Sequence, residues 1–456
     1  MTNFPFHWKG DFPLWYLASY AFMTAASSPG LLRSLRRRDL VAVVLNGVIG
    51  AGIFGLPSRI FALAGGYSLA SFAVCAACVA LIVLSFAEVA GRFSATGGPY
   101  LFARATFGPV SGFVVGWLVW IARITSFSAN STLLPEYLGF FFPAAASGVW
   151  RAAILTGVVV LLAILNVRGV RGTADASNFF AVGKLLPLAV FIVVGLFFLA
   201  PARFAAGASP GYHPFSLSVL LLVYAFTGFE MATIPAGETR SPGRDVPPAL
   251  MIGMAIVVAV YVFIQAVCIG TLPELASSSR PLADAAARFL GAGGAAMITA
   301  GIVISLAGNL NVLILSASRM LFAMAEHGCL PAPLAAVHAR FRTPAIAVLF
   351  TTAVMLLLAV SGTFIYLVTL STIARLVTYF ATCAALPVLR RREKSPAREF
   401  RLRAGVLIAT AGMLVCLWLL SNISLREARD AGLAVAAGLA IYWSQTLARR
   451  ASEPRA

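Results

Sequence analysis

Long apolar stretches separated by short polar loops dominate this sequence. Twelve stretches reach about twenty residues, the length of a helix that crosses the hydrocarbon core of a bilayer. Because they are continuously apolar rather than alternating, they favour helices over the strands of a membrane barrel. They cover approximately residues 40–63, 67–91, 110–134, 151–167, 178–200, 215–236, 249–271, 294–324, 344–361, 363–388, 404–421 and 431–448. We therefore predict an all-α polytopic membrane protein with 12 transmembrane helices.

The balance of charge supports a bilayer as the surrounding medium. The chain is 60% hydrophobic and 11% charged, whereas a soluble domain is about 25% charged. Its net charge of +18 would suggest a nucleic-acid partner in a soluble domain. Here the basic residues lie between apolar stretches, so we expect the lipid bilayer, and no nucleic acid, as the partner. The sequence does not indicate an oligomeric state.

The basic residues also predict an orientation. One set of loops is rich in arginine, including Arg36–Arg38 and Arg390–Arg392, and the other set is poorer. Cytoplasmic loops carry the excess of Lys and Arg, so both termini are expected on the cytoplasmic side. The membrane is expected to be the cell (inner, cytoplasmic) membrane. Residues 1–38 are expected to form a cytoplasmic tail. Its first 35 residues are either dispensable, with Met23 as the true start, or an interfacial anchor.

Two stretches contain residues that interrupt helices. Residues 47–57 read GVIGAGIFGLP and residues 224–235 read YAFTGFEMATIP, and glycine and proline both weaken a helix. They occupy the first and sixth stretches, which cross in opposite directions. This spacing predicts an inverted repeat of five helices. The predicted segments are repeat one at 39–200, repeat two at 211–390, a basic loop at 391–403, two additional helices at 404–448 and a tail at 449–456.

Interrupted helices inside a bilayer indicate a binding site. Unwound backbone leaves N–H and C=O groups unpaired, which is tolerated only where the segment lines a cavity. Helix N-termini there face an anion, and C-terminal carbonyls face a cation. An α-amino acid carries both charges. A glycine cluster can instead serve close helix packing, but two clusters in matching positions favour a site.

The same residues resemble a known family. Over about residues 38–448 the chain resembles the amino acid–polyamine–organocation (APC) permeases, through GVIGAGIFGLP and longer motifs at 87–117, 224–249 and 317–347. The resemblance implies a twelve-helix, five-plus-five inverted repeat whose first and sixth helices are broken. It also implies transport of amino acids by alternating access.

The resemblance further implies where a substrate binds. Its carboxylate would meet the backbone N–H groups of Ala51 and Gly52, and many relatives have serine at the position of Ala51. Its ammonium would meet backbone carbonyls, and Tyr224 would occlude the site unless it is a core aromatic residue. The candidate substrate-binding residues are Val48, Ile49, Gly50, Ala51, Gly52, Arg123, Ser126, Tyr224, Phe226 and Thr227.

Lys184 is the strongest candidate for proton coupling. Charged groups are costly at mid-membrane, so each is a functional candidate. In some proton-coupled relatives a lysine at this place stands where sodium-coupled transporters hold sodium. Its ammonium could meet carbonyls that end the first half-helix, such as those of Asn46 and Ile49, with Ser305 nearby. The alternative is a lysine that reaches the cytoplasmic interface.

Other charged residues leave alternatives open. Glu230 either responds to protons, as proposed for relatives, or pins the unwound segment as a neutral or paired carboxylate. Arg123 either faces the cavity and repels cationic substrates, or pairs with Glu136 or a carbonyl. Three further residues, Glu88, Arg319 and Arg375, are assigned to cytoplasmic helix ends as anchors or inner-gate ion pairs.

A transporter explains the sequence better than an enzyme does. None of the four histidines lies in the core of a stretch, no metal site is evident, and no phosphate-binding loop is present. A channel or sensor on the same fold stays open, but two intact interruptions argue for transport. We predict a secondary amino-acid transporter with a proton gradient and no cofactor, and an amino-acid or polyamine exchanger as the alternative.

Overall fold

The computed structural model describes residues 31–50, 52–205, 209–361, 364–392, 400–421 and 423–452. Within these ranges the chain is helical, and extended backbone pairs only at an isolated parallel bridge between Leu35 and Thr239. Met23, Ala51 and residues 393–399 of the predicted basic loop lie outside the described residues.

A helix lies on every apolar stretch that the sequence predicts. The α-helices are α2 (Arg37–Val48), α3 (Gly52–Ala64), α4 (Ser68–Ala90), α5 (Pro99–Phe107), α6 (Pro109–Leu138), α7 (Gly148–Arg168), α8 (Val170–Leu196), α9 (Tyr212–Ala225), α10 (Pro242–Thr271), α11 (Pro281–Glu326), α12 (Ala345–Ser361), α13 (Phe364–Arg392), α14 (Gly405–Leu420) and α15 (Leu425–Ser452). The 3₁₀ helices are η1 (Gly65–Tyr67), η2 (Pro143–Ala146), η3 (Pro201–Phe204), η4 (Phe229–Glu238), η5 (Leu275–Ser277) and η6 (Ala332–Ala335). The first stretch is divided between α2 and α3, and the sixth between α9 and η4. Both predicted interruptions are therefore breaks in helices.

The helices are long and apolar enough for a polytopic membrane protein. Eight helices in the described ranges could cross a bilayer by length and composition. The pair Gly405–Leu420 and Leu425–Leu447, which is bent by 114°, raises the number to nine if it is one span. The all-helical membrane class is thus confirmed, while the twelve crossings and the inverted repeat stay predictions.

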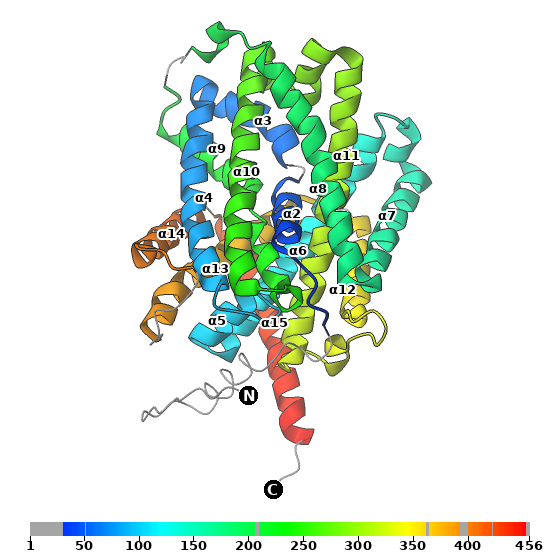
Figure 1. Ribbon diagram of the computed structural model, residues 1–456, viewed down its shortest axis with the longest axis vertical. Coiled ribbons are helices and arrows are strands. Elements are labelled where there is room, and N and C mark those ends of the chain that lie inside the picture. Colours follow the sequence, from blue (N-terminus) through cyan, green and yellow to red (C-terminus); the bar gives the residue numbers. More distant parts are fainter. Residues whose placement is uncertain are drawn as a thin grey trace.

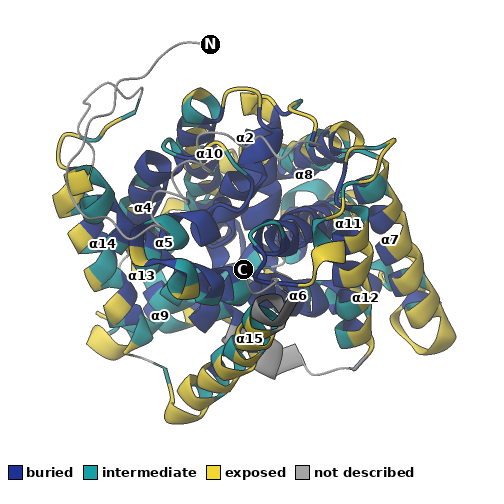
Figure 2. Ribbon diagram, turned by 90° about the horizontal axis from the view of Figure 1, so that it is seen from below, coloured by how far each residue is buried: buried dark blue, intermediate teal, exposed yellow. Residues whose placement is uncertain are grey.

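The two breaks lie in the interior of the bundle, where Gly47, Val48 and Gly228 are buried. Helix α11 packs against α6 and α8, α13 packs against α6, and α10 packs against α2. In Figure 1, α2 and α6 lie near the centre, with α7 and α12 on one side and α14 on the other. Figure 2 shows buried residues concentrated around this centre, while α7, α12, α14 and α15 carry exposed residues.

Helix α8 illustrates how the sequence separates a lipid-facing side from a core side. Phe179 is 67% exposed and Leu186 is 64% exposed, whereas Lys184 is fully buried. Large apolar side chains on an outer surface match a hydrocarbon environment. The helix thereby directs one charged side chain toward the breaks.

Candidate functional site

The first break connects α2 to α3, and side chains from other helices satisfy its carbonyl groups. Helix α2 ends at Val48, and α3 begins at Gly52. Asn309 Nδ2 donates to the Asn46 carbonyl at 2.9 Å and to the Gly47 carbonyl at 3.1 Å. Tyr261 Oη donates to the Val48 carbonyl at 3.0 Å. The unwound backbone is therefore held by α10 and α11, as a break inside a membrane requires.

The second break lies against the first. Helix α9 ends at Ala225, and η4 begins after Gly228, whose φ is +114°. A Cβ on Gly47 would lie 2.7 Å from the Gly228 carbonyl oxygen, and a Cβ on Gly228 would overlap the Gly47 carbonyl. Glycine is needed at both positions because the two backbones touch, and at Gly228 also because of its positive φ.

Lys184 bonds to the end of the first half-helix. Its Nζ donates to the Ile49 carbonyl at 2.7 Å and to the Ser305 carbonyl at 3.3 Å. The Ser305 hydroxyl donates to the same Ile49 carbonyl at 2.9 Å. In the described part of the chain no carboxylate pairs with this ammonium. The alternative of a lysine that reaches the cytoplasmic interface is therefore wrong, because the side chain is fully buried.

A small cavity lies between the two breaks. Its volume is about 30 Å³. Because one water needs about 10–15 Å³ of such volume, the cavity has room for about two waters. Its walls are formed by Gly47, Val48, Gly50, Gly52, Asn130, Tyr224, Ala225, Thr227, Asn309 and Arg375. Gly52 begins α3, and first-turn N–H groups have no partner within their own helix.

Arg123 and Glu230 form a buried ion pair beside the second break. Arg123 Nη2 donates to Glu230 Oε1 at 2.5 Å, and both side chains are 1% exposed. Glu230 Oε2 accepts from the Gly228 N–H at 3.0 Å and from Tyr379 Oη at 2.6 Å. Arg123 therefore pairs with Glu230 rather than with Glu136 or a carbonyl. Glu230 is a paired carboxylate that holds the Gly228 N–H of the unwound segment, while its response to protons stays a prediction.

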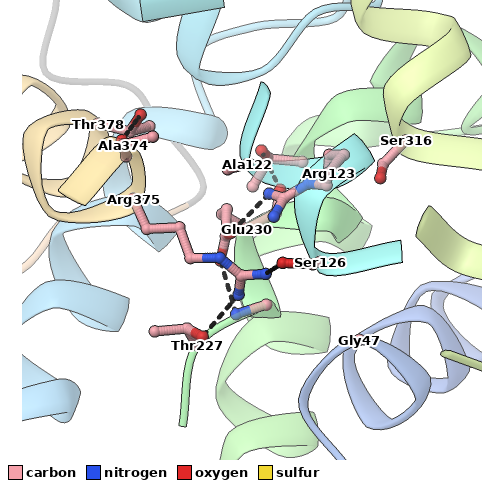
Figure 3. A network of polar contacts seen from close by, with 12 residues as sticks. Gly47, Ala122, Arg123, Ser126, Thr227, Glu230, Ser316, Ala374, Arg375 and Thr378 are labelled. Carbon is pink, nitrogen blue, oxygen red and sulfur yellow. Dashed lines mark hydrogen bonds and ion pairs between the residues drawn. The ribbon is translucent and has the colours of Figure 1, made fainter. Parts of the chain in front are cut away.

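Arg375 is a site residue that the sequence analysis placed wrongly. It lies on α13 and lines the cavity rather than a cytoplasmic helix end. Its Nη1 donates to Thr227 Oγ1 at 2.5 Å, and its Nη2 donates to Ser126 Oγ at 2.7 Å. Figure 3 shows the guanidinium reaching Thr227 of the second break and Ser126 of α6, near the Arg123–Glu230 pair. In the sequence, an arginine near polar residues in an apolar stretch looks like an anchor at a helix end. Only the fold shows that Arg375 lies at the cavity.

The other predicted site residues are divided between the cavity and its surroundings. Ser126 is not among the cavity-lining residues, and its hydroxyl bonds to Ser371 Oγ at 2.7 Å as well as to Arg375. Phe226 packs on Tyr261, with ring centroids 5.0 Å apart, and is fully buried. Asn46 donates from Nδ2 to the Ser177 carbonyl at 2.7 Å, away from Lys184. Its Oδ1 is buried without a hydrogen-bond partner.

Buried ion pairs lie at other helix ends. Glu88 pairs with Arg92 at 2.9 Å and with Arg390 at 2.6 Å. Arg319 forms a bidentate pair with Glu238 at the end of η4, and both side chains are fully buried. The predicted ion pairing of Glu88 and Arg319 is therefore confirmed, while their role in gating stays a prediction.

Comparison with known proteins identifies the family. The model of the family described as "Amino acid permease" matches residues 35–436. The chain belongs to this amino acid permease family. It is 26% identical to the branched-chain amino acid permease BcaP of Bacillus subtilis, over 86% of this chain and 88% of that protein.

Two further relatives are named as exchangers. The serine/threonine exchanger SteT of Bacillus subtilis is 27% identical over 90% of this chain and 95% of that protein. The arginine/ornithine antiporter of Pseudomonas aeruginosa is 33% identical over 66% of this chain and 65% of that protein. These relatives are transporters, so membership of a permease family rather than an enzyme family is confirmed. Among the described residues, no group of three or more His, Cys, Asp or Glu side chains could hold a metal ion.

Proposed function

We propose that this permease moves an amino acid across the cytoplasmic membrane by alternating access. The observation that carries the proposal is the meeting of two broken helices at one polar cavity. We assign the substrate carboxylate to the N-terminus of α3, at Ala51 and Gly52, because unpaired N–H groups and the helix dipole favour an anion there. The proposal includes twelve crossings, both termini in the cytoplasm, and the repeats at 39–200 and 211–390.

We assign the substrate ammonium to a carbonyl beside the same cavity. Val48, Tyr224 and Thr227 line it, but the Tyr224 carbonyl already accepts from the Thr227 N–H and Oγ1. The Val48 carbonyl likewise accepts from the Gly50 N–H and Tyr261 Oη, so among these three we assign the ammonium to the Thr227 carbonyl. Ile49 is reassigned from the substrate to Lys184, because its carbonyl already accepts from Lys184 Nζ and Ser305 Oγ. A zwitterion would then bridge α3 and the second break, and its arrival would change the spacing of the two backbones.

We propose that Lys184 couples transport to the proton gradient. Its ammonium bonds to the Ile49 carbonyl, at the negative end of the α2 dipole. Release of a proton would weaken this bond because charged hydrogen bonds are about twice as strong as neutral ones. The end of α2 would then separate more easily from α8. In this scheme substrate and proton load from outside and leave inside together, and no cofactor takes part.

Exchange is the second candidate, because relatives over 90% and 66% of the chain are named as an exchanger and an antiporter. One experiment separates the two. Purified protein is reconstituted in proteoliposomes, and uptake of a pool of labelled amino acids is measured under an inward proton gradient. Symport predicts accumulation that a protonophore abolishes. Exchange predicts uptake that ignores the gradient and requires amino acid inside. Absence of both would refute amino-acid transport.

A further inference from the structure

The cavity carries a positive charge that no described carboxylate neutralises by direct contact. Among its described lining residues, Arg375 is the one with a charged side chain. It is 6% exposed, and its guanidinium donates to Thr227 and Ser126, which offer neutral hydroxyl groups. Its Nε is buried without a hydrogen-bond partner. The guanidinium therefore has hydrogen-bonding capacity left over at the edge of the cavity.

The nearby carboxylate is already occupied. Glu230 Oε1 accepts from Arg123, and Glu230 Oε2 accepts from the Gly228 N–H and Tyr379 Oη. Two guanidinium groups thus share one carboxylate in the interior, and Arg123 Nε and Nη1 are themselves without partners. Buried charges are normally paired, because desolvation without a counter-charge is costly. A buried guanidinium without a directly bonded carboxylate indicates a ligand that supplies the missing anion.

We propose that Arg375 selects an acidic amino acid by binding the carboxylate of its side chain. This inference rests on the proposed function, in which the N-terminus of α3 takes the α-carboxylate at another wall of the cavity. The side-chain carboxylate would replace the hydroxyl groups of Ser126 and Thr227 as acceptors of the guanidinium. An arginine suits this role because its planar donors match a carboxylate bidentately.

The size of the cavity requires its lining groups to move before an acidic amino acid can bind. A volume of about 30 Å³ is too small for glutamate or aspartate, so the lining groups must separate to admit it. Arg375 joins α13 to both α6 and the second break through its two hydroxyl acceptors. A substrate carboxylate that draws the guanidinium away releases both contacts. A cationic side chain would instead meet like charge and be excluded.

The test compares glutamate with its neutral isostere glutamine, and with cationic arginine, in proteoliposomes. Uptake of labelled L-glutamate, L-glutamine and L-arginine is measured at matched concentrations for the wild type, Arg375→Gln and Arg375→Lys. We expect a KM for glutamate about tenfold or more below that for glutamine, since one charge-assisted pair separates the two. Arg375→Gln should bring this ratio close to one by raising the glutamate KM, and Arg375→Lys should restore part of it. Arg426→Gln changes an exposed residue that does not line the cavity, so it should leave the ratio unaltered.

The inference can be overturned even if Arg375→Gln fails to fold. If Arg375→Gln weakens glutamate and glutamine equally, Arg375 serves the α-carboxylate and not the side chain. If Arg375→Gln does not fold, the wild-type ratio decides alone, and glutamine transported as well as glutamate refutes the selection. Transport of neutral amino acids without an acidic preference overturns this inference but leaves the proposed function intact. If no amino acid of a full pool is bound in a thermal-shift assay or transported, both this inference and the proposed function are refuted.

Discussion

The Ile49 carbonyl has two side-chain donors, and this redundancy gives a quantitative prediction. Lys184 Nζ lies 2.7 Å from it and Ser305 Oγ lies 2.9 Å from it. Replacing either donor alone leaves the carbonyl satisfied, whereas replacing both leaves a buried acceptor without a side-chain partner. An unsatisfied buried acceptor costs about 1–3 kcal/mol. We therefore expect the double variant to lose more stability than the two single variants together.

The magnitudes of the single changes are small for separate reasons. Ser305→Ala removes one neutral hydrogen bond, which contributes about 0.5–1.5 kcal/mol. Lys184→Met removes the ammonium bonds but also the desolvation penalty of a buried charge, so its net effect is expected to be near zero. The double variant should lose about 1–3 kcal/mol more of the free energy of unfolding than the two single variants lose together.

The assay is a double-mutant cycle on the free energy of unfolding. Unfolding of the purified protein is followed by SDS titration in mixed micelles, with circular dichroism as the readout. Lys184→Met combined with Ser218→Ala is the control, because the Ser218 hydroxyl bonds to Ser71 and Phe215 and shares no partner with Lys184. The control pair should be additive within about 0.5 kcal/mol. Additivity of the Lys184 and Ser305 changes to the same precision would refute the shared role at Ile49.

Three further changes test separate parts of the structure. Glu230→Gln strands Arg123 in the interior, so it should destabilise the protein by about 3–5 kcal/mol in the same titration; a loss below 1 kcal/mol would contradict the pair. Gly228→Ala places a Cβ against the Gly47 carbonyl, and the positive φ at this position costs about 1–2 kcal/mol more. The variant should therefore lose the monodisperse gel-filtration peak of the folded protein. Burial lowers the pKa of His327, just beyond α11, from 6.5 to about 4. The unfolded state then binds more protons, so stability should fall as pH drops from about 6.5 toward 4, and His327→Asn should remove that slope.

The breaks could be predicted from the sequence because their cause is local. Glycine and proline at 47–57 and 224–235 oppose helix in apolar stretches that must otherwise be helical. Lys184 was equally visible as a charge in an apolar run. The family resemblance then supplied a site, and the structure brings Lys184, Ser305 and Ile49 together as the sequence suggested.

The partners of the breaks could not be predicted because they depend on distant segments. Arg123 meets Glu230 across 107 positions in the chain, and Arg375 meets Thr227 across 148. Asn309 and Tyr261, which satisfy the first break, were not singled out at all. Both are polar residues in apolar stretches, where a polar side chain needs a partner. The sequence does not indicate which carbonyl each of them binds.

The most direct test of proton coupling compares Lys184→Gln and Lys184→Arg with the wild type in proteoliposomes. Accumulation driven by an inward proton gradient and counterflow without a gradient are measured on the same preparations. Glutamine keeps a donor for the Ile49 carbonyl without a charge, and arginine keeps the charge but does not release a proton. We predict that both variants lose gradient-driven accumulation, while Lys184→Gln retains counterflow. Gradient-driven accumulation at the wild-type level in either variant would contradict the assignment of Lys184 as the coupling residue.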